Sequence, residues 1–224
     1  GVAVEGARAV VSEGDHLVIL DLAEPLAPAV VALGAALRGA ARVAALQGGI
    51  AFVLETARRP DGAPGPVRDV ALHLVDVDAR SEPRIAASLS LDLPVVADLV
   101  PVGPRAWLAA GNDGVVAVDL TDPERPRRER AVDVGGSAVS VAAVGDRLVA
   151  ARAARGAEPD ALVILDAATG GSLAEPLPLD WLPRQVAAVP GGRFALVGGE
   201  ALLAVDVAAD PPVVVARSEG ILVL

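Results

Sequence analysis

The chain has 224 residues, is 53% hydrophobic and carries a net charge of −10, with two Phe, two Trp, no Tyr and no Cys. The negative charge makes nucleic acids and anionic membrane surfaces poor partners. The absence of Cys excludes disulfides, thiolate metal sites and a cysteine nucleophile.

In chain order, one phrase recurs five times: an aliphatic run that ends in aspartate, at residues 17–21, 72–76, 115–119, 162–166 and 202–206. The aspartates are 55, 43, 47 and 40 residues apart, a period typical of four-stranded propeller blades. The sequence therefore predicts an all-β fold: a single β-propeller domain, residues 1–224, with five blades of four antiparallel strands. The units are approximately residues 1–34, 35–92, 93–135, 136–180 and 181–224.

Apolar segments punctuated by Gly, Asp and Pro predict the remaining strands of each unit. The first, innermost strands are residues 2–6, 43–48, 99–103, 141–145 and 186–191. The second strands are residues 8–13, 50–55, 106–110, 147–152 and 193–197. The aspartate phrases are the third strands, and their consecutive apolar residues predict burial on both faces. The charged residues 127–134 predict a fourth strand that is an exposed edge.

Four segments need a separate interpretation. Residues 32–46 alone would favour a helix, but the repeat register predicts an outer strand, a turn and an inner strand there. Residues 57–69 and 153–160 are expected to be long hairpin loops, which either carry function or reflect tolerated length variation. Residues 221–224 are expected to complete the inner strand of the first unit; alternatively, the chain is an excerpt from a longer repeat array.

The repeated aspartate has a structural and a functional interpretation. An Asp at a strand end accepts hydrogen bonds from backbone N–H groups just ahead of it and fixes the turn. Five such residues, one in each blade, would be too far apart to share a calcium ion. We therefore expect the aspartate to be a structural cap.

No catalytic residue, metal site or cofactor is expected. His16 and His73 lie five and three residues before their aspartates, so the repeat does not pair them as zinc ligands. Calcium could bind through Asp76, Asp78 and Glu82, or through Asn112 and Asp113, but neither stretch has the spacing of an EF-hand loop. All basic residues are Arg, so covalent mechanisms that need Lys or Cys are excluded.

The segment from Val115 to Pro126 reads VVAVDLTDPERP, and it resembles the LVIVD repeat, an aliphatic run and Asp followed by Asp-Pro-x-x-Pro. Three of the other copies match this pattern less completely, and residues 167–170 replace the Asp-Pro turn with Ala-Ala-Thr-Gly. The resemblance implies a β-propeller of an exported or surface-associated bacterial protein, commonly with no assigned reaction. The composition, rich in Ala, Gly, Pro and Val with Arg as its only basic residue, agrees with a bacterial source of high GC content.

The best candidate site is the lining of the central channel, where propeller ligands tend to bind. The polar residues at the start of the inner strands are Arg42, Asp98, Ser140, Arg184 and Gln185. We expect a non-catalytic binding or scaffolding module with an extracellular, periplasmic or cell-surface location and a protein or carbohydrate partner. The alternatives are a propeller hydrolase or lyase with a polar site at the channel, or a fragment of a larger multidomain repeat protein. No membrane insertion is expected, because residues 25–37 form an apolar stretch of only about 13 residues where ~20 would be needed.

Overall fold

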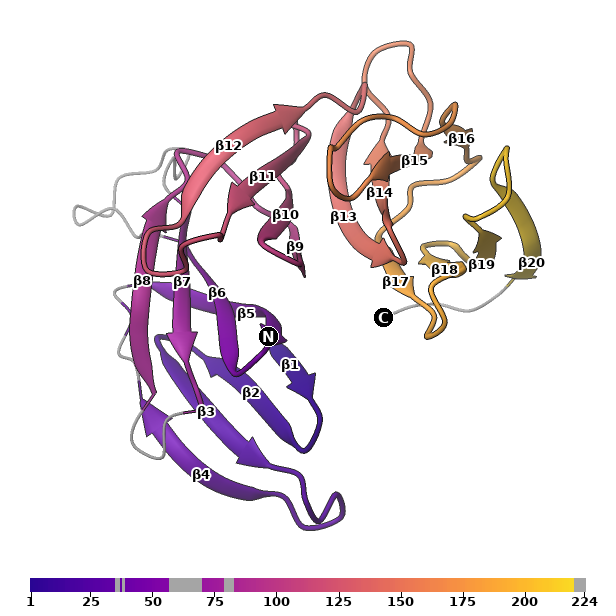
Figure 1. The fold of residues 1–224 in the computed structure, drawn as a ribbon. Helices are drawn as coiled ribbons and strands as arrows, with labels where there is room; N and C mark the ends of the chain where they lie inside the picture. The colour runs from indigo at the N-terminus through magenta and orange to yellow at the C-terminus, as the bar shows by residue number, and fades with distance from the viewer. Residues whose placement is uncertain (35–36, 38, 57–69, 79–82, 220–224) are drawn as a thin grey trace. The chain divides into compact units, whose positions relative to one another are not determined.

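A computed structural model describes residues 1–34, 37, 39–56, 70–78 and 83–219. These residues form twenty strands in five four-stranded antiparallel sheets, and no helix (Figure 1). The first sheet contains β1 (Val2–Glu5), β2 (Arg8–Glu13), β3 (His16–Asp21) and β4 (Ala29–Gly34). The second contains β5 (Ala40–Gln47), β6 (Ile50–Thr56), β7 (Val70–Asp76) and β8 (Arg84–Ser90). The predicted all-β fold with five four-stranded units is confirmed.

The remaining three sheets repeat the same order along the chain. The third contains β9 (Asp98–Val102), β10 (Arg105–Ala109), β11 (Val115–Asp119) and β12 (Arg127–Val132). The fourth contains β13 (Ser137–Val144), β14 (Arg147–Ala153), β15 (Ala161–Asp166) and β16 (Leu177–Pro178). The fifth contains β17 (Gln185–Ala188), β18 (Phe194–Gly198), β19 (Ala201–Asp206) and β20 (Val213–Glu219).

The chain divides into two compact units, residues 1–95 with 119–128, and residues 96–118 with 129–224. In the first unit, one aliphatic cluster fills the space between the first and second sheets. In the second unit, one cluster lies between the third and fourth sheets and another between the fourth and fifth. That residues 1–224 make a single domain stays a prediction.

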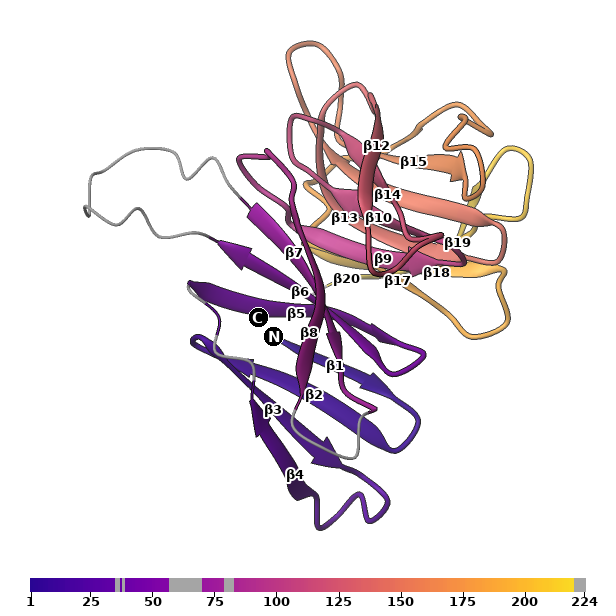
Figure 2. The same ribbon diagram turned by 60° about the vertical axis from the view of Figure 1, so that its left-hand side comes forward.

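Burial of the third strands follows the number of covered faces. In β15, Leu162 and Ile164 pack into one cluster while Val163 and Leu165 pack into the other, so both faces of this strand are covered as predicted. The prediction is wrong for β3 and β19, in which buried and half-buried residues alternate. Within its unit, each of these two strands belongs to a sheet that packs another sheet on one face only, and alternation follows from that. Figure 2 shows the four strands of the first sheet side by side.

All five repeated aspartates are structural caps, as predicted. Each carboxylate accepts a hydrogen bond from a backbone N–H two or three residues ahead, at 2.6 to 3.1 Å. In the third and fourth sheets a threonine adds a hydroxyl donor at 2.6 Å, Thr121 to Asp119 and Thr169 to Asp166. By accepting these bonds, the carboxylate stabilises the turn that follows each third strand.

Two of these carboxyl groups have pKa values held below the usual range. The Thr169 hydroxyl and backbone N–H lower the pKa of Asp166. The side chain of Arg193, with Nη2 at 2.7 Å, lowers the pKa of Asp206, and the backbone N–H groups of Ala208 and Ala209 act in the same direction. Hydrogen bonds to the ionised form stabilise it relative to the protonated form.

β4 and β5 occupy most of residues 29–47, which confirms the register over the helical propensity, and residues 35, 36 and 38 lie outside the described part. Residues 57–69 and 221–224 also lie outside it. The loop 153–160 is held by the buried Arg152, which donates to the carbonyls of Val134 and Pro159 at 3.0 and 2.9 Å. That this loop carries function, or instead reflects tolerated length variation, stays a prediction.

Candidate functional site

The five predicted channel residues are distributed over both units. Arg42 lies on β5 in the first unit, half-buried beside Gly1. In the second unit, Asp98 opens β9, Ser140 lies on β13, and Arg184 and Gln185 stand exposed at the start of β17. That these residues line a channel stays a prediction.

Asp98 and Ser140 lie in contact, and both side chains form hydrogen bonds with backbone N–H groups. The Ser140 hydroxyl donates to Asp98 at 2.6 Å and accepts from the backbone N–H of Val186 at 3.0 Å. The Asp98 carboxylate also accepts from the N–H groups of Leu99 and Val141 at 2.9 and 3.2 Å. The pair therefore joins the inner strands β9, β13 and β17, and sequence reasoning did not detect this role.

A similar hydroxyl bond joins the sheets of the first unit. Ser12 on β2 accepts from the backbone N–H of Val43 on β5 at 3.1 Å. The same bond recurs at equivalent positions of three repeats, the first residues of the predicted inner strands: Val43, Val141 and Val186. The backbone N–H of each donates to a side-chain oxygen of the preceding sheet. These polar side chains satisfy backbone donors that would otherwise be unpaired between packed sheets.

His73 belongs to a hydrogen-bonded relay of three side chains that no sequence pattern predicted. Its Nε2 lies 2.7 Å from Glu55 Oε2, and its Nδ1 lies 2.7 Å from Ser88 Oγ. With Glu55 ionised, Nε2–H donates to the carboxylate and Nδ1 accepts from the Ser88 hydroxyl. Glu55 and His73 are buried on β6 and β7, whereas Ser88 is exposed on β8. The geometry is that of a carboxylate, an imidazole and a hydroxyl in line.

A groove of about 900 Å³ opens in the first unit, between the first sheet and the β5–β6 turn. Its floor is apolar and consists of Ile19, Ala32, Leu46 and Val77, which belong to or pack against the core of this unit. Leu33 of β4 also lines the groove, and 63% of its surface is exposed. The groove is thus an open continuation of the hydrophobic core.

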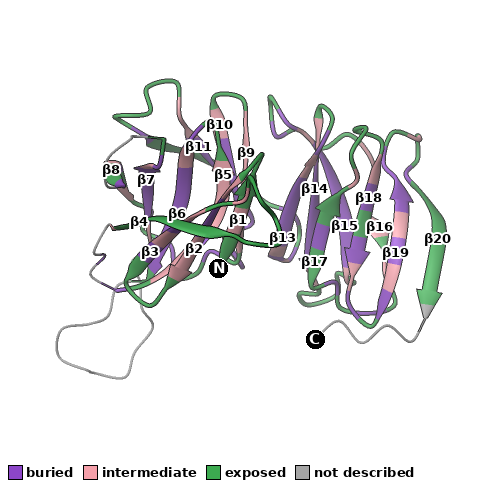
Figure 3. Ribbon diagram, turned by 90° about the horizontal axis from the view of Figure 1, so that it is seen from below, coloured by how far each residue is buried: buried purple, intermediate pink, exposed green. Residues whose placement is uncertain are grey.

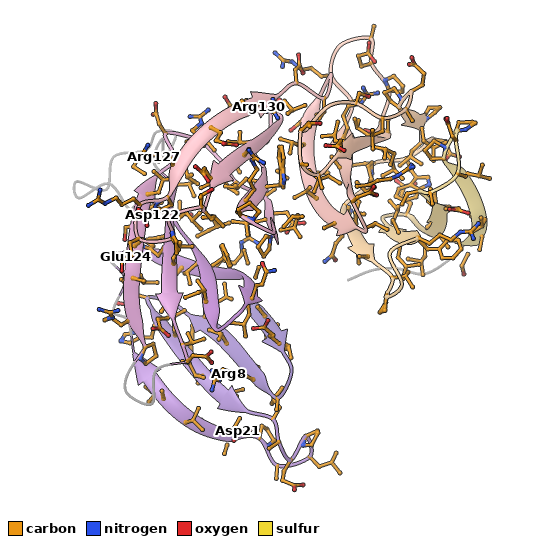
Figure 4. All side chains as sticks on the ribbon, viewed as in Figure 1. Arg8, Asp21, Asp122, Glu124, Arg127 and Arg130 are labelled. Atoms are coloured by element: carbon orange, nitrogen blue, oxygen red, sulfur yellow. The ribbon has the colours of Figure 1, made fainter. Side chains whose placement is uncertain are left out.

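The rim of the groove is acidic. Three carboxylates, Glu5, Asp21 and Asp78, face one guanidinium, Arg8. Arg8 forms an ion pair with Asp78 and lies directly opposite Asp21 across β2 and β3, and Figure 4 labels both Arg8 and Asp21.

The third carboxylate of the rim holds the neighbouring sheet. Glu5 accepts from the backbone N–H groups of Gly48 and Gly49 at 2.8 and 3.3 Å. Gly49 has a φ of +72°, and a Cβ there would meet the Asp78 carboxylate at 2.1 Å. Glycine at this position lets the turn of the second sheet close against the rim.

The first candidate calcium site lies only partly within the described residues. Among the described residues, no three His, Asp or Glu side chains are grouped so that they could hold a metal ion. Asp76 caps its own turn through Asp78 N–H at 3.0 Å, and Glu82 lies outside the described residues.

Comparison with known proteins shows the fold and no family. The chain matches no known family model and no curated protein. It is similar to the solved structure of U3-55K, with a TM-score of 0.62 and 14% identity over 96% of this chain and 65% of that one. It is also similar to KlHsv2 with loop 6CD replaced by a Gly-Ser linker, with a TM-score of 0.68 and 13% identity over 99% of this chain and 66% of that one.

A third similar structure is the Mitotic Checkpoint Complex, with a TM-score of 0.69 and 14% identity over 96% of this chain and 62% of the matched chain. These structures have WD40-type β-propeller folds, so the present chain has a propeller-type fold. The chain spans slightly less than two thirds of the length of each of the three matched chains. In the part of the chain that the structure describes, no helix has the length and apolar character to cross a membrane.

Proposed function

We propose that this chain is a non-catalytic binding or scaffolding β-propeller of the LVIVD-repeat type, from an exported or cell-surface bacterial protein. The observation that carries the proposal is the use of the inner-strand polar groups. Asp98 and Ser140, the pair closest to a catalytic arrangement in the predicted site, have their oxygen atoms occupied by three backbone N–H groups and by each other. A carboxylate held in this way is a strand connector rather than a base.

Other features support the proposed class and location. The segment from Val115 to Pro126 has the repeat's aliphatic run and Asp-Pro-x-x-Pro turn, in which the Asp122 carbonyl accepts from Arg125 N–H at 2.9 Å. Asp122 and Glu124 of this turn are labelled in Figure 4. The net charge of −10 opposes binding to nucleic acid. A protein or carbohydrate partner is the expectation that remains, and the groove in the first unit offers a surface for it.

The proposal is tested by photocrosslinking in the producing cells. A benzophenone amino acid is placed in turn at Leu33, Arg184, Gln185 and Val215, and adducts are sought together with the protease sensitivity of the protein in intact cells. A discrete adduct at one or more positions, on a protein degraded by protease added outside the cell or to its periplasm, is the expected result. The absence of adducts at all four positions, or a protein confined to the cytosol, would contradict the proposal.

The relay of Glu55, His73 and Ser88 favours a second candidate, a hydrolase that uses Ser88 as nucleophile. His73 would accept the hydroxyl proton while the Ser88 oxygen attacks an ester carbonyl, and Glu55 would stabilise the imidazolium. The ester C–O bond would break as His73 returns this proton to the leaving alcohol, and water would then release the acyl group from Ser88. A fluorophosphonate probe tests this directly. Labelling of the native protein that disappears in both Ser88→Ala and His73→Gln would establish the hydrolase; no labelling of native protein would dismiss it.

A further inference from the structure

β4 differs in chemistry from the other long outer strands. Its sequence is AVVALG, without a charged residue, whereas β8 is RIAASLS, β12 is RRERAV and β20 is VVVARSE. Charged residues on an edge strand prevent unwanted pairing with other chains. The expected charged edge is therefore present in β12 and missing in β4.

The aliphatic residues of β4 stand in solvent. Val30, Val31 and Leu33 have exposed fractions of 59%, 56% and 63%. Figure 3 shows β4 mostly in green, the colour of exposed residues, with Ala32 and Gly34 of intermediate burial. Among the described residues β4 pairs with β3 alone, so its outer row of backbone N–H and C=O groups has no strand beside it. A neutral, aliphatic and unpaired strand is a template for one more strand.

The groove beside β4 indicates which side chain a partner strand would carry. Val31 and Leu33 line it together with the acidic rim defined by Glu5, Asp21 and Asp78. Among the described residues that line the groove, three carboxylates face one guanidinium, that of Arg8, so this part of the lining carries a net negative charge. A Lys or Arg side chain, apolar along its stem and cationic at its tip, matches both the floor and the rim.

We propose that an extended segment of another protein pairs with β4 as a fifth strand, and that a Lys or Arg of this segment enters the acidic groove. The inference rests on the proposed binding function and specifies its partner. A six-residue strand such as β4 is about 20 Å long, enough for a partner segment of six or seven residues.

The charge of the chain favours a segment of another protein over a second copy of this chain as the partner of β4. Two copies would each bring a net charge of −10 and would place two acidic rims on the same interface. Arg8, the one basic residue among the described residues of the groove lining, is already paired with Asp78 in each copy. A basic, aliphatic segment of a different protein therefore fits the edge better.

The test uses synthetic heptapeptides as probes. One set is built from Val and Ser with a single Lys at each of the seven positions, a second set has Glu in place of Lys, and a third has the Lys sequences with alternate backbone nitrogens methylated. We expect fluorescence polarisation to show that the best Lys peptide binds at least tenfold tighter than its Glu and methylated counterparts. Methylation removes the backbone donors that strand pairing requires but keeps the side chains.

Two variants of the whole chain localise the binding. Leu33→Lys places a positive charge on the proposed edge and is expected to weaken the Lys peptide at least tenfold. Val215→Lys, on β20 and 53% exposed, is the matched control and is expected to leave the affinity within twofold. Asp21→Asn is expected to weaken the Lys peptide severalfold and to leave the Glu peptide unchanged.

Several results would overturn the inference. They are equal binding of the Lys, Glu and methylated sets, binding that survives Leu33→Lys, and a dimer seen by light scattering that Leu33→Lys dissociates. Failure of this inference is distinguishable from failure of the proposed function. Photocrosslinked adducts at Arg184 or Gln185 with none at Leu33 would keep the binding function and reject β4 as its site.

Discussion

The hydroxyl of Ser140 donates to Oδ2 of Asp98 at 2.6 Å, and Ser140 Oγ also accepts the backbone N–H of Val186 at 3.0 Å. One side chain thus connects the inner strands of three successive sheets. Ser140→Ala removes both bonds and leaves the N–H of the buried Val186 without its acceptor. We expect a loss of about 1–3 kcal/mol in the free energy of unfolding, measured by urea denaturation.

The exposed Ser90 of β8 provides the control for this prediction. Ser90→Ala is expected to change the free energy of unfolding by less than about 0.5 kcal/mol. Equal stabilities of the Ser140→Ala and Ser90→Ala proteins would show that the Asp98–Ser140 connection contributes nothing.

Asp119 tests the structural role of the repeated aspartate. Its Oδ1 accepts from both the N–H and the hydroxyl of Thr121, at 2.8 and 2.6 Å. Thr121 is exposed, so water can replace part of the lost bonding in Asp119→Ala, and we expect a loss of about 1 kcal/mol. Asp113→Ala, in an exposed turn of the same sheet, should cost less than about 0.5 kcal/mol, and the two urea midpoints should differ accordingly.

The capped carboxylates predict the response of stability to acid. Asp166 and Asp206 have lowered pKa values in the folded chain, the first through Thr169 and the second through Arg193. Their contribution is complete above the unfolded-state pKa of about 3.9, and it is lost as pH falls towards the folded-state values, because the unfolded chain then binds more protons. The urea midpoint should therefore fall as the pH drops below about 4.

Thr169→Val and Arg193→Gln remove the principal donors and should flatten this dependence. Each variant is expected to lose stability at pH 7 and little at low pH, where the carboxylates are protonated. A parallel shift of the whole pH profile would contradict the assignment to these two aspartates.

Gly170 is required by both its backbone and its surroundings. Its φ is +65°, and a Cβ there would lie 2.8 Å from the buried ring of Trp107. Gly170→Ala is therefore expected to cost about 2–4 kcal/mol and to change the near-ultraviolet circular dichroism of the tryptophan. Gly156 has a φ of +64° with no atom within 4 Å of the added Cβ, so Gly156→Ala isolates the backbone term, about 1 kcal/mol. Equal losses would show that the contact with Trp107 is unimportant.

The repeat made the strand order predictable, because five copies of one aspartate phrase align every other segment. Burial was less predictable: β15 and β3 have equally aliphatic sequences, yet only β15 has a core cluster on each face within its unit. The relay through His73 joins residues 18 and 15 positions apart, which become neighbours only after strands pair. The groove is likewise lined by residues of the first two sheets, which are far apart in the sequence.

One signal for the groove was present in the sequence. β4 lacks the charges found on β8, β12 and β20, and comparison of the outer strands would have identified it. The acidic rim could not be found in this way. Asp21 is itself a capping residue, and Asp78 lies in the turn that Asp76 caps. An acidic residue at either position therefore already has a structural explanation.

The repeated aspartate maintains the architecture, whereas β4, which differs from the other outer strands, is the proposed binding edge. The most direct test measures the affinity of the best Lys heptapeptide and the urea midpoint for two variants, Asp119→Ala and Leu33→Lys. We predict that Asp119→Ala lowers the midpoint and leaves the affinity of the folded protein within twofold, and that Leu33→Lys leaves the midpoint unchanged and lowers the affinity at least tenfold. Loss of affinity in Asp119→Ala at full folding, or its retention in Leu33→Lys, would contradict the claim.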